Sequence, residues 1–514
     1  MKYLKNILLI ALIFSLSIAC DDKLNEPLEN EPLGITKTVE GQRNILLGAY
    51  QKFYDLGWEV HPTIGLRGDD VNKAGGTDQA IMETLDNYKY DPNAWFLNTT
   101  WNGFYNDIVA GFSLEIEKIR EINEVLDDKS GGNQYVAEIQ VLIGFELLQL
   151  TRMWGDILVP TSSNSDEFKA LPLTRREDAL KYISELMDKA LPDLPDTRPN
   201  QRSDIQGGVT RYTALAIKAM ANLDLENYQA VEEATSEIIQ NGGFSLYNDF
   251  YYLFKKAGEL SDESLLELQY SDFGSSSTAT NEYNHQYDFY GPLSDGWKPL
   301  IPGVSGGWGF YEPTLKYIEF MLDRKDYSRL ETSVLFTPNG VKQLENDGYN
   351  DLPDFTNAAE DGFIYTRDGD GIGNHARALF QSGKFYLPSI EISSNVNRYN
   401  SGKNFIVIRY SEILLMHAEA IVSGAASTSI SAEEAVNMVR ARAGLDPLAA
   451  VTLDDVLDEK YAEFATEWGI RFADVVRHGF TSELNEGGKI YDPSNDRFVP
   501  YPTAQVDQLP QLSN

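Results

Sequence analysis

The sequence has little cysteine and little histidine. Its 514 residues include a single cysteine, Cys20, and five histidines, none of which lies within four residues of another. One thiol cannot form an internal disulfide, so the fold is not held together by disulfide bridges. Isolated histidines provide no pair of ligands on one helix face. The sequence therefore predicts no zinc site, no cysteine nucleophile and no bound cofactor.

Basic residues are scarce relative to acidic ones. The chain has 43 Lys and Arg against 78 Asp and Glu, which gives a formal net charge of −35. Such a charge repels nucleic acids and anionic lipid surfaces, so we expect no nucleic-acid partner. The two signs are interspersed rather than blocked, which is typical of a solubilising surface on a protein outside the cell.

Long apolar runs are absent after the first twenty residues, and no later window approaches the 18 apolar residues of a membrane-spanning helix. Residues 1–19 carry two lysines among the first six positions, continue through the apolar run Ile7–Ile18 and end at the small residue Ala19. This order is that of a secretory signal peptide. The apolar run is too short to cross a hydrocarbon core of about 30 Å as a helix.

Cys20 stands where the signal peptide ends. The segment Ser17–Cys20 is similar to a lipobox in which serine replaces the usual leucine, and it predicts lipid attachment to the Cys20 sulfur. The alternative is an ordinary cleaved signal followed by an unmodified cysteine. Several acyl chains on one cysteine would make a durable membrane anchor. Residues 20–36 are acidic and contain prolines, so we expect an extended spacer there.

Helical periodicity dominates the first and last parts of the mature chain. The predicted helices cover Gly41–Tyr54, Asn98–Glu124, Gln134–Trp154, a helix opened by a Thr174–Glu177 capping box, Thr210–Leu223, Asn227–Gln240, Phe405–Val422, a helix from a Ser431–Glu434 capping box to Arg442, and Leu453–Trp468. Alanines recur in the pair formed by residues 210–240, as in tetratricopeptide-type repeats. We therefore predict a mainly α fold whose scaffold consists of tetratricopeptide-like helical pairs.

The middle of the chain has a different character. Residues 244–400 are rich in Gly, Ser, Asn, Asp and aromatics, and few stretches show a helical period. A structureless loop of this length is uncommon in a compact protein, so we expect an irregular, loop-rich subdomain. The predicted organisation is an N-terminal helical scaffold at 37–243, the loop-rich ligand-binding region at 244–400 and a C-terminal helical region at 401–514.

Motifs of catalysis or metal binding are weak. Residues 303–307 match the G-x-S-x-G nucleophile elbow by letter, but prolines precede them and no helix pattern follows, so a glycine-rich loop is favoured. Asp368, Asp370 and Asn374 offer the oxygen ligands of a calcium loop without its bidentate Glu, which favours a plain surface turn. We predict that the protein is not an enzyme.

Aromatic residues accumulate in polar loops. Phe244 to Tyr311 contains 16 Phe, Tyr or Trp residues in 68 positions, and Tyr290, Trp297 and Trp308 lie among Gly, Ser, Asp and Pro. Trp58, Trp95 and the stretch from Arg67 to Asn72 form a second polar-aromatic cluster. Rings beside free polar groups suit flat amphipathic ligands such as sugars. We therefore predict a binding face in these loops.

Several segments together resemble the SusD/RagB family of Bacteroidota outer-membrane nutrient-binding lipoproteins. The residues that carry the resemblance are Trp101-x-x-x-Tyr105-x-x-Ile108, Leu150-x-x-Met153-Trp154-Gly155-Asp156-x-x-x-Pro160, Asp323-Arg324-Lys325, Ile408-Arg409-Tyr410-x-Glu412-x-Leu414-Leu415-Met416-x-Ala418-Glu419-Ala420, Asn437-x-Val439-Arg440-x-Arg442-Ala443-Gly444-Leu445 and Glu463-Phe464-x-x-Glu467-x-Gly469-x-Arg471-Phe472. Their order extends over nearly the whole mature chain. Glu459-Lys460 and Trp468 depart from the usual pattern.

The resemblance implies a SusD-like fold and a non-catalytic role. It implies a lipid-anchored, surface-exposed position in the outer membrane, where the protein captures oligosaccharide or polysaccharide and passes it to a SusC-like TonB-dependent transporter. Mapped onto this sequence, the family's ligand loops place glycan-binding residues at Asp70, Asn72, Trp95, Tyr290, Trp297 and Trp308. The acidic surface favours a neutral glycan, for example a β-glucan such as laminarin. A RagB-like relative that captures peptides is the alternative.

Overall fold

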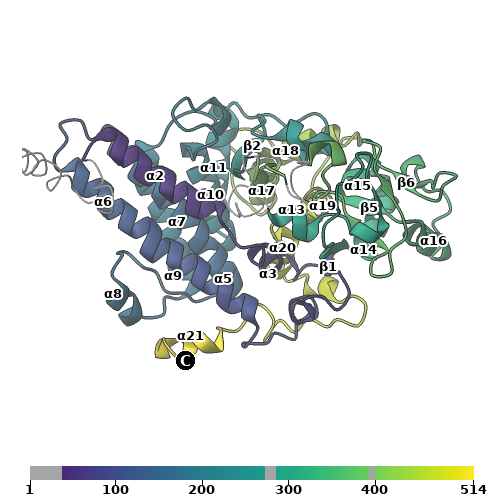
Figure 1. Ribbon diagram of the computed structural model, residues 1–514. Coiled ribbons are helices and arrows are strands. Elements are labelled where there is room, and N and C mark those ends of the chain that lie inside the picture. Colours follow the sequence, from purple (N-terminus) through teal and green to yellow (C-terminus); the bar gives the residue numbers. More distant parts are fainter. Residues whose placement is uncertain (1–36, 272–284, 393–398, 400, 514) are drawn as a thin grey trace, which may run out of the picture.

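The computed structural model describes residues 37–271, 285–392, 399 and 401–513 (Figure 1). The predicted signal peptide, Cys20 and the spacer lie outside these residues. The protein is mostly helical, as predicted, with a layer of long helices at one end and short strands and helices at the other (Figure 1). Among the described residues, none of the helices combines the length and the apolar character needed to traverse a bilayer.

Long helices form the N-terminal part. They are α2 (Val39–Tyr54), α3 (Val60–Gly65), α4 (Glu83–Asp86), α5 (Trp95–Tyr105), α6 (Leu114–Asn123), α7 (Ser130–Trp154), α8 (Ser165–Ala170), α9 (Arg176–Ala190), α10 (Arg211–Asp224) and α11 (Tyr228–Asn241). A π-helical segment, Asn106–Ser113, joins α5 to α6, so the single long helix predicted there is broadly confirmed. The other predicted helices of this part are confirmed to within a few residues at each end.

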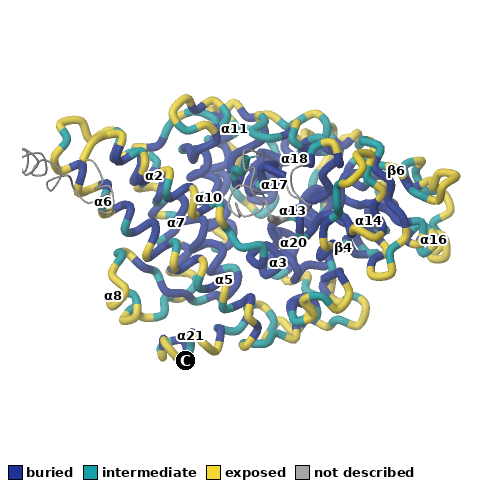
Figure 2. The backbone as a smooth tube through the Cα atoms, in the orientation of Figure 1, coloured by how far each residue is buried: buried dark blue, intermediate teal, exposed yellow. Residues whose placement is uncertain are grey.

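Small side chains bring these helices together in pairs. Ala214, Ala216, Ala219 and Ala221 of α10 have no exposed surface, and α10 packs against α9 and α11. The α7 helix is buried along most of its length, because α2, α6 and α9 cover it from different sides. Figure 2 shows the resulting buried interior running through α7, α10 and α17. The predicted tetratricopeptide-like pairing is therefore present.

The C-terminal part of the chain supplies further helices, and the middle supplies shorter ones. They are α12 (Phe250–Leu253), α13 (His285–Tyr290), α14 (Leu315–Arg324), α15 (Tyr327–Ser333), α16 (Pro338–Asn346), α17 (Tyr410–Val422), α18 (Ala432–Arg442), α19 (Leu453–Phe464), α20 (Ile470–His478) and α21 (Thr503–Val506). The predicted Ser431–Glu434 capping box is confirmed at the start of α18.

The strands are short and pair antiparallel. They are β1 (Val71–Lys73), β2 (Ser264–Leu268), β3 (Trp297–Lys298), β4 (Tyr311–Pro313), β5 (Val334–Phe336), β6 (Ile364–Tyr365), β7 (Gly371–Ile372), β8 (Phe380–Ser382) and β9 (Phe405–Arg409). β1 pairs with β4, β2 with β9 and β5 with β8, while β7 lies between β3 and β6. Two of these pairings, β1–β4 and β2–β9, join segments from different predicted regions of the chain.

Two local predictions are wrong. Phe405–Arg409 is not the first turn of a helix: it forms β9, because β2 provides a strand partner for its backbone, and the helix begins at Tyr410. Thr174 does not cap α9, because its backbone exchanges two hydrogen bonds with Ile157, at 3.0 and 2.8 Å, and holds it in an extended bridge. Arg175 takes the N-cap position instead.

A buried ion-pair network ties the C-terminal helices to Glu263, which directly precedes β2. Arg409 contacts Glu263 at 3.2 Å and Glu467 at 2.8 Å, and Glu263 also accepts a 3.0 Å contact from Arg442. Glu463, which has no exposed side-chain surface, contacts Arg409 and Arg442. Four of these residues belong to the motifs that carry the family resemblance. Their role is structural, because they neutralise one another inside the protein.

Candidate functional site: an aromatic surface

Five aromatic side chains from three distant parts of the sequence contact one another. We call them the aromatic surface: Trp58, Trp95, Phe289, Trp308 and Phe310. Trp58 is central: its ring stacks on Phe289, with centroids 4.0 Å apart, and lies 5.7 Å from the rings of both Trp95 and Phe310. Trp308 extends the row by stacking on Phe310 at 6.4 Å.

The rings at the two ends are open to solvent. Trp95 is 40% exposed and Trp308 is 48% exposed, whereas Phe310 is 3% exposed and acts as the floor between them. Trp58 and Phe289 are half-buried. An exposed tryptophan is large and apolar, and two of them on one connected row make a surface suited to the apolar face of a flat ligand.

Backbone hydrogen bonds fix the segment that carries Trp308 and Phe310. The Trp308 N–H donates to the carbonyl of Asp288 at 2.8 Å, and the Phe310 N–H donates to that of Phe289 at 3.0 Å. On its other side the Phe310 carbonyl accepts from the Ala74 N–H at 2.8 Å, which prolongs the β1–β4 pairing. The rings therefore stand on a backbone held from both sides.

Gly75 allows the close approach of the Phe310 ring. Its φ is +84°, a conformation that favours glycine, and a Cβ at this position would lie 2.8 Å from Phe310 Cδ1. A larger residue would strain the backbone and displace the ring. Gly75 thus determines where the floor of the aromatic surface lies.

Polar groups border the aromatic surface near Phe310. The Lys73 ammonium lies 5.7 Å from the Phe310 ring centroid and donates to the carbonyl oxygens of Gly76, at 2.8 Å, and Asp78. Arg377 donates to the Gly75 carbonyl at 3.0 Å and to the Asp78 carboxylate at 2.7 Å. Lys73 is buried and holds the backbone of residues 76–78, whereas Arg377 is exposed. Arg377 therefore places a hydrogen-bonding group open to solvent near the rings, as recognition of a hydroxylated ligand requires.

The six residues predicted to bind glycan are only partly brought together. Trp95 and Trp308 lie at the two ends of the aromatic surface. Asn72 is half-buried in β1, where its side-chain oxygen accepts from Lys489 at 2.5 Å. For these three residues the structure leaves some side-chain surface open.

The other three predicted residues are buried. Asp70 accepts from the Thr466 N–H at 2.6 Å, and burial raises the pKa of its carboxyl to about 6. Tyr290 stacks on Tyr311 at 4.6 Å and donates to the Trp58 carbonyl, and Trp297 meets Tyr399 edge-on at 5.3 Å. Their exposed fractions are 2%, 0% and 7%, and of the three only Tyr290 contacts the aromatic surface, through the Trp58 carbonyl.

Phe289 and Phe310 were not among the predicted binding residues, and Trp58 was recognised only as part of a cluster. Nothing in the sequence separates Phe289 from its buried neighbour Tyr290, because both lie on one short helix. Phe289 and Tyr290 differ in exposure because the backbone of their helix pairs with residues 307–310. The sequence around the helix does not reveal this pairing.

The two weak sequence motifs, at residues 303–307 and 368–374, have structural roles. Residues 303–307 lie in a loop that no strand directly precedes and no helix directly follows, as expected. Asp370 is buried rather than on a surface turn, and accepts from the Ser389 N–H and the Tyr386 hydroxyl, both at 2.7 Å. Over the described residues, no group of three His, Cys, Asp or Glu side chains is placed to hold a metal ion.

The architecture defines a class of mainly helical proteins in which an irregular, aromatic-rich half is built onto paired helices. Residues 262–513 match the model of the SusD family. A SusD-like protein of Bacteroides ovatus is 22% identical over 486 residues, covering 90% of this chain and 80% of the relative. The chain belongs to the SusD family.

Solved structures share this fold over nearly the whole chain. A laminarin-binding SusD-like protein has a TM-score of 0.73 at 20% identity, covering 91% of this chain and 97% of that chain. Surface glycan-binding protein A from Bacteroides thetaiotaomicron, solved in complex with laminarihexaose, has a TM-score of 0.73 at 19% identity, covering 92% and 98%. The predicted SusD-like fold is therefore confirmed.

Proposed function

We propose that this protein is a lipid-anchored, cell-surface glycan-binding protein that captures a neutral oligosaccharide or polysaccharide without cleaving it. The observation that carries the proposal is the aromatic surface, whose two exposed tryptophans lie on one connected row of rings. Sugars present apolar C–H faces and polar edges, which match rings bordered by the exposed Arg377. Similar structures whose names mention laminarin or laminarihexaose support this ligand class.

The proposed role in uptake is delivery of the captured glycan to a SusC-like TonB-dependent transporter. Family membership and the predicted lipid at Cys20 support it, because they would keep the protein beside an outer-membrane transporter. The strongly acidic composition favours a neutral ligand over a polyanionic one. Laminarin, a β-glucan, is the ligand we would test first.

The test uses residues 21–514, which contain every described element. Affinity electrophoresis and isothermal titration would compare laminarin and xyloglucan with alginate and with a mixed peptide pool. We expect binding to a neutral glycan and none to the other ligands. Binding of peptides alone would favour the RagB-like alternative, and release of reducing ends would show that the protein is an enzyme.

Trp95→Ala and Trp308→Ala locate the site. Each should weaken glycan binding by about tenfold or more, because each removes a large ring from the contact. Phe480→Ala is the matched control, since Phe480 is 36% exposed and lies outside the aromatic surface. Unchanged affinity in both tryptophan variants would place the glycan elsewhere on the protein.

A further inference from the structure

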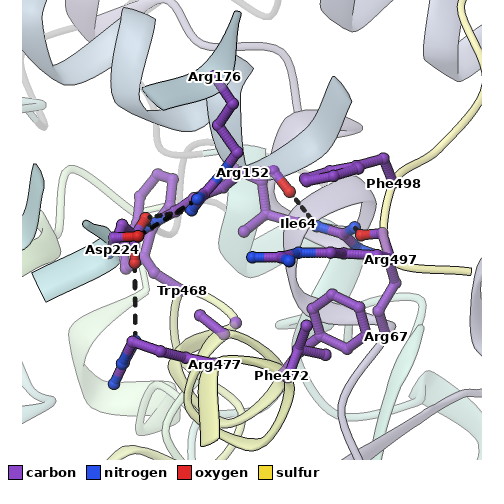
Figure 3. Close-up of a pocket in the computed structure, with 13 residues that line it drawn as sticks. Ile64, Arg67, Arg152, Arg176, Asp224, Trp468, Phe472, Arg477, Arg497 and Phe498 are labelled. Carbon is purple, nitrogen blue, oxygen red and sulfur yellow. Dashed lines mark hydrogen bonds and ion pairs between the residues drawn. The ribbon is translucent and has the colours of Figure 1, made fainter. Parts of the chain in front are cut away.

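A cavity lined by arginines lies at the junction of α7, α9, α10 and α20 with the C-terminal segment (Figure 3). Five arginines line it, together with a single acidic residue, Asp224: they are Arg67, Arg152, Arg176, Arg477 and Arg497. This concentration of positive charge is unexpected in a chain of net charge −35. None of the five rings of the aromatic surface lines the cavity, so it is a separate site.

Asp224 is shared by three of the arginines. Its carboxylate contacts Arg152 at 2.9 Å, Arg176 at 3.4 Å and Arg477 at 3.6 Å. Arg477 is also paired with Glu419 and Asp474, both at 2.6 Å, so its charge is compensated from behind. The single negative charge of Asp224 is therefore shared between Arg152 and Arg176. It does not compensate the charges of the remaining two arginines, Arg67 and Arg497.

Arg67 and Arg497 stand opposite Asp224 in Figure 3. Arg67 is 2% exposed, donates to the carbonyls of Arg497 and Arg152 at 3.3 Å each, and lies 4.4 Å from the Phe472 ring centroid. Its Nε has no hydrogen-bond partner, and neither does the buried Nε of Arg176. Among the described residues, no carboxylate forms an ion pair with Arg67 or Arg497. A buried guanidinium without a counter-charge is costly.

The electrostatics agree with this excess of positive charge. Burial lowers the pKa of Arg67, and it also lowers the pKa of Arg176, where Arg497, Arg152 and Arg477 add repulsion to the effect of burial. Arginine does not relieve such repulsion by losing its proton in ordinary conditions, because its pKa is too high. An anion from solution would relieve it.

We propose that this cavity binds a tetrahedral oxyanion, a phosphate or sulfate group. Guanidinium groups match the oxygen pairs of such anions, and charge-assisted hydrogen bonds to them are about twice as strong as neutral ones. The cavity volume is about 40 Å³, against the roughly 10–15 Å³ needed to hold one water, so a small anion fits.

The cavity adjoins a cleft of about 470 Å³, through which we expect an anion to enter. The cleft and the cavity share Arg176, Asp224, Arg497 and Phe498. A free ion can pass through this opening, and an ester group can enter the cavity while the sugar that bears it stays in the cleft. A free ion and a sugar ester present the same tetrahedral oxyanion, and the titration described next distinguishes between them.

The test is titration calorimetry on residues 21–514 with inorganic phosphate, inorganic sulfate and glucose 6-sulfate, at an ionic strength held constant with sodium chloride. We expect one-site binding that Arg497→Ala and Arg176→Gln each weaken tenfold or more. Arg497 is exposed and Arg176 is half-buried, so both variants should fold, which thermal unfolding would verify. Arg120→Ala, at an exposed position of α6, is the control and should bind like the wild type.

Tighter binding of glucose 6-sulfate than of the free ions would assign the site to an ester, and binding of free ions alone would assign it to inorganic anions. The proposal would be overturned by the absence of binding to all three anions, or by equal binding to the wild type and both cavity variants.

Discussion

At the residue scale, His61 occupies an unusual environment. It is 1% exposed and surrounded by the rings of Tyr290, Tyr311, Phe385, Phe405 and Trp468, with centroids 5.2–5.4 Å away. Neither ring nitrogen has a hydrogen-bond partner, and burial lowers the pKa of His61 to about 3. The imidazole is therefore a neutral, aromatic component of the core that supports Tyr290 beneath Trp58.

This pKa predicts how His61 affects stability. In the unfolded chain His61 takes up a proton below about pH 6.5, whereas in the folded protein it does not until about pH 3. Falling pH therefore favours the unfolded state, by about 1.4 kcal/mol per pH unit below 6.5. The wild type should lose about 2 kcal/mol relative to His61→Phe between pH 7.5 and pH 5, measured by urea unfolding.

The comparison with His61→Phe isolates this contribution from other titrating groups. Asp70 acts in the opposite direction, because its pKa is raised to about 6 and its protonation stabilises the folded state as pH falls. Asp70 is present in both proteins, so its contribution cancels in the difference. Parallel pH profiles for the two proteins would contradict the buried, neutral state of His61.

At the scale of elements, the β1–β4 pair positions the aromatic surface, and Gly75 sets its floor. Gly75→Ala should lower the free energy of unfolding by about 1–2 kcal/mol, because an L-residue is strained at φ +84°. The added methyl group should also displace Phe310 and weaken glycan binding severalfold. Unfolding and titration measurements on the same sample check both effects.

Gly424→Ala is the matched control for Gly75→Ala. Gly424 has a φ of +108°, and a Cβ there would meet nothing within 4 Å. It should therefore lose stability in the same way but bind glycan like the wild type. If the two variants bind equally well, the position of Phe310 has no part in recognition.

The elements that could be predicted from the sequence are those whose signal is local. The α7 and α10 helices follow from apolar spacing, and α18 from its capping box. β9 was missed because the apolar run Phe405–Ile408 is ambiguous by itself, and its partner β2 lies some 140 residues earlier. Pairing between strands so far apart produces no pattern in the sequence of either strand.

The same distinction applies to the candidate site. Trp95 and Trp308 could be recognised because tryptophans among polar and glycine residues are conspicuous. That Tyr290 and Trp297 are buried, while Phe289 is partly open, depends on contacts with residues 307–310 and with Tyr399. The arginine cavity was not predicted at all, because its arginines come from five separate elements or loops.

At the scale of the whole molecule, the arginine cavity is a positive site in a chain of net charge −35. The two proposed sites should therefore differ in how strongly their affinity depends on salt. Binding of a neutral glycan to rings should change less than about twofold between 50 and 500 mM sodium chloride, because no charge is neutralised. Oxyanion binding in the arginine cavity should weaken over the same range. Titration calorimetry at the two salt concentrations checks this, and a strongly salt-dependent glycan affinity would indicate a charged glycan.

The main hydrophobic core takes residues from all three predicted regions, from Ile45 to Leu512. Trp154 in α7 donates to the carbonyl of Pro500 at 3.1 Å, which joins the first region to the last. An exchange of whole regions between relatives would cut through this shared interior and expose apolar surface on both sides. We therefore expect ligand preference to change through substitutions of loop side chains, and not through exchange of the segments that carry those loops.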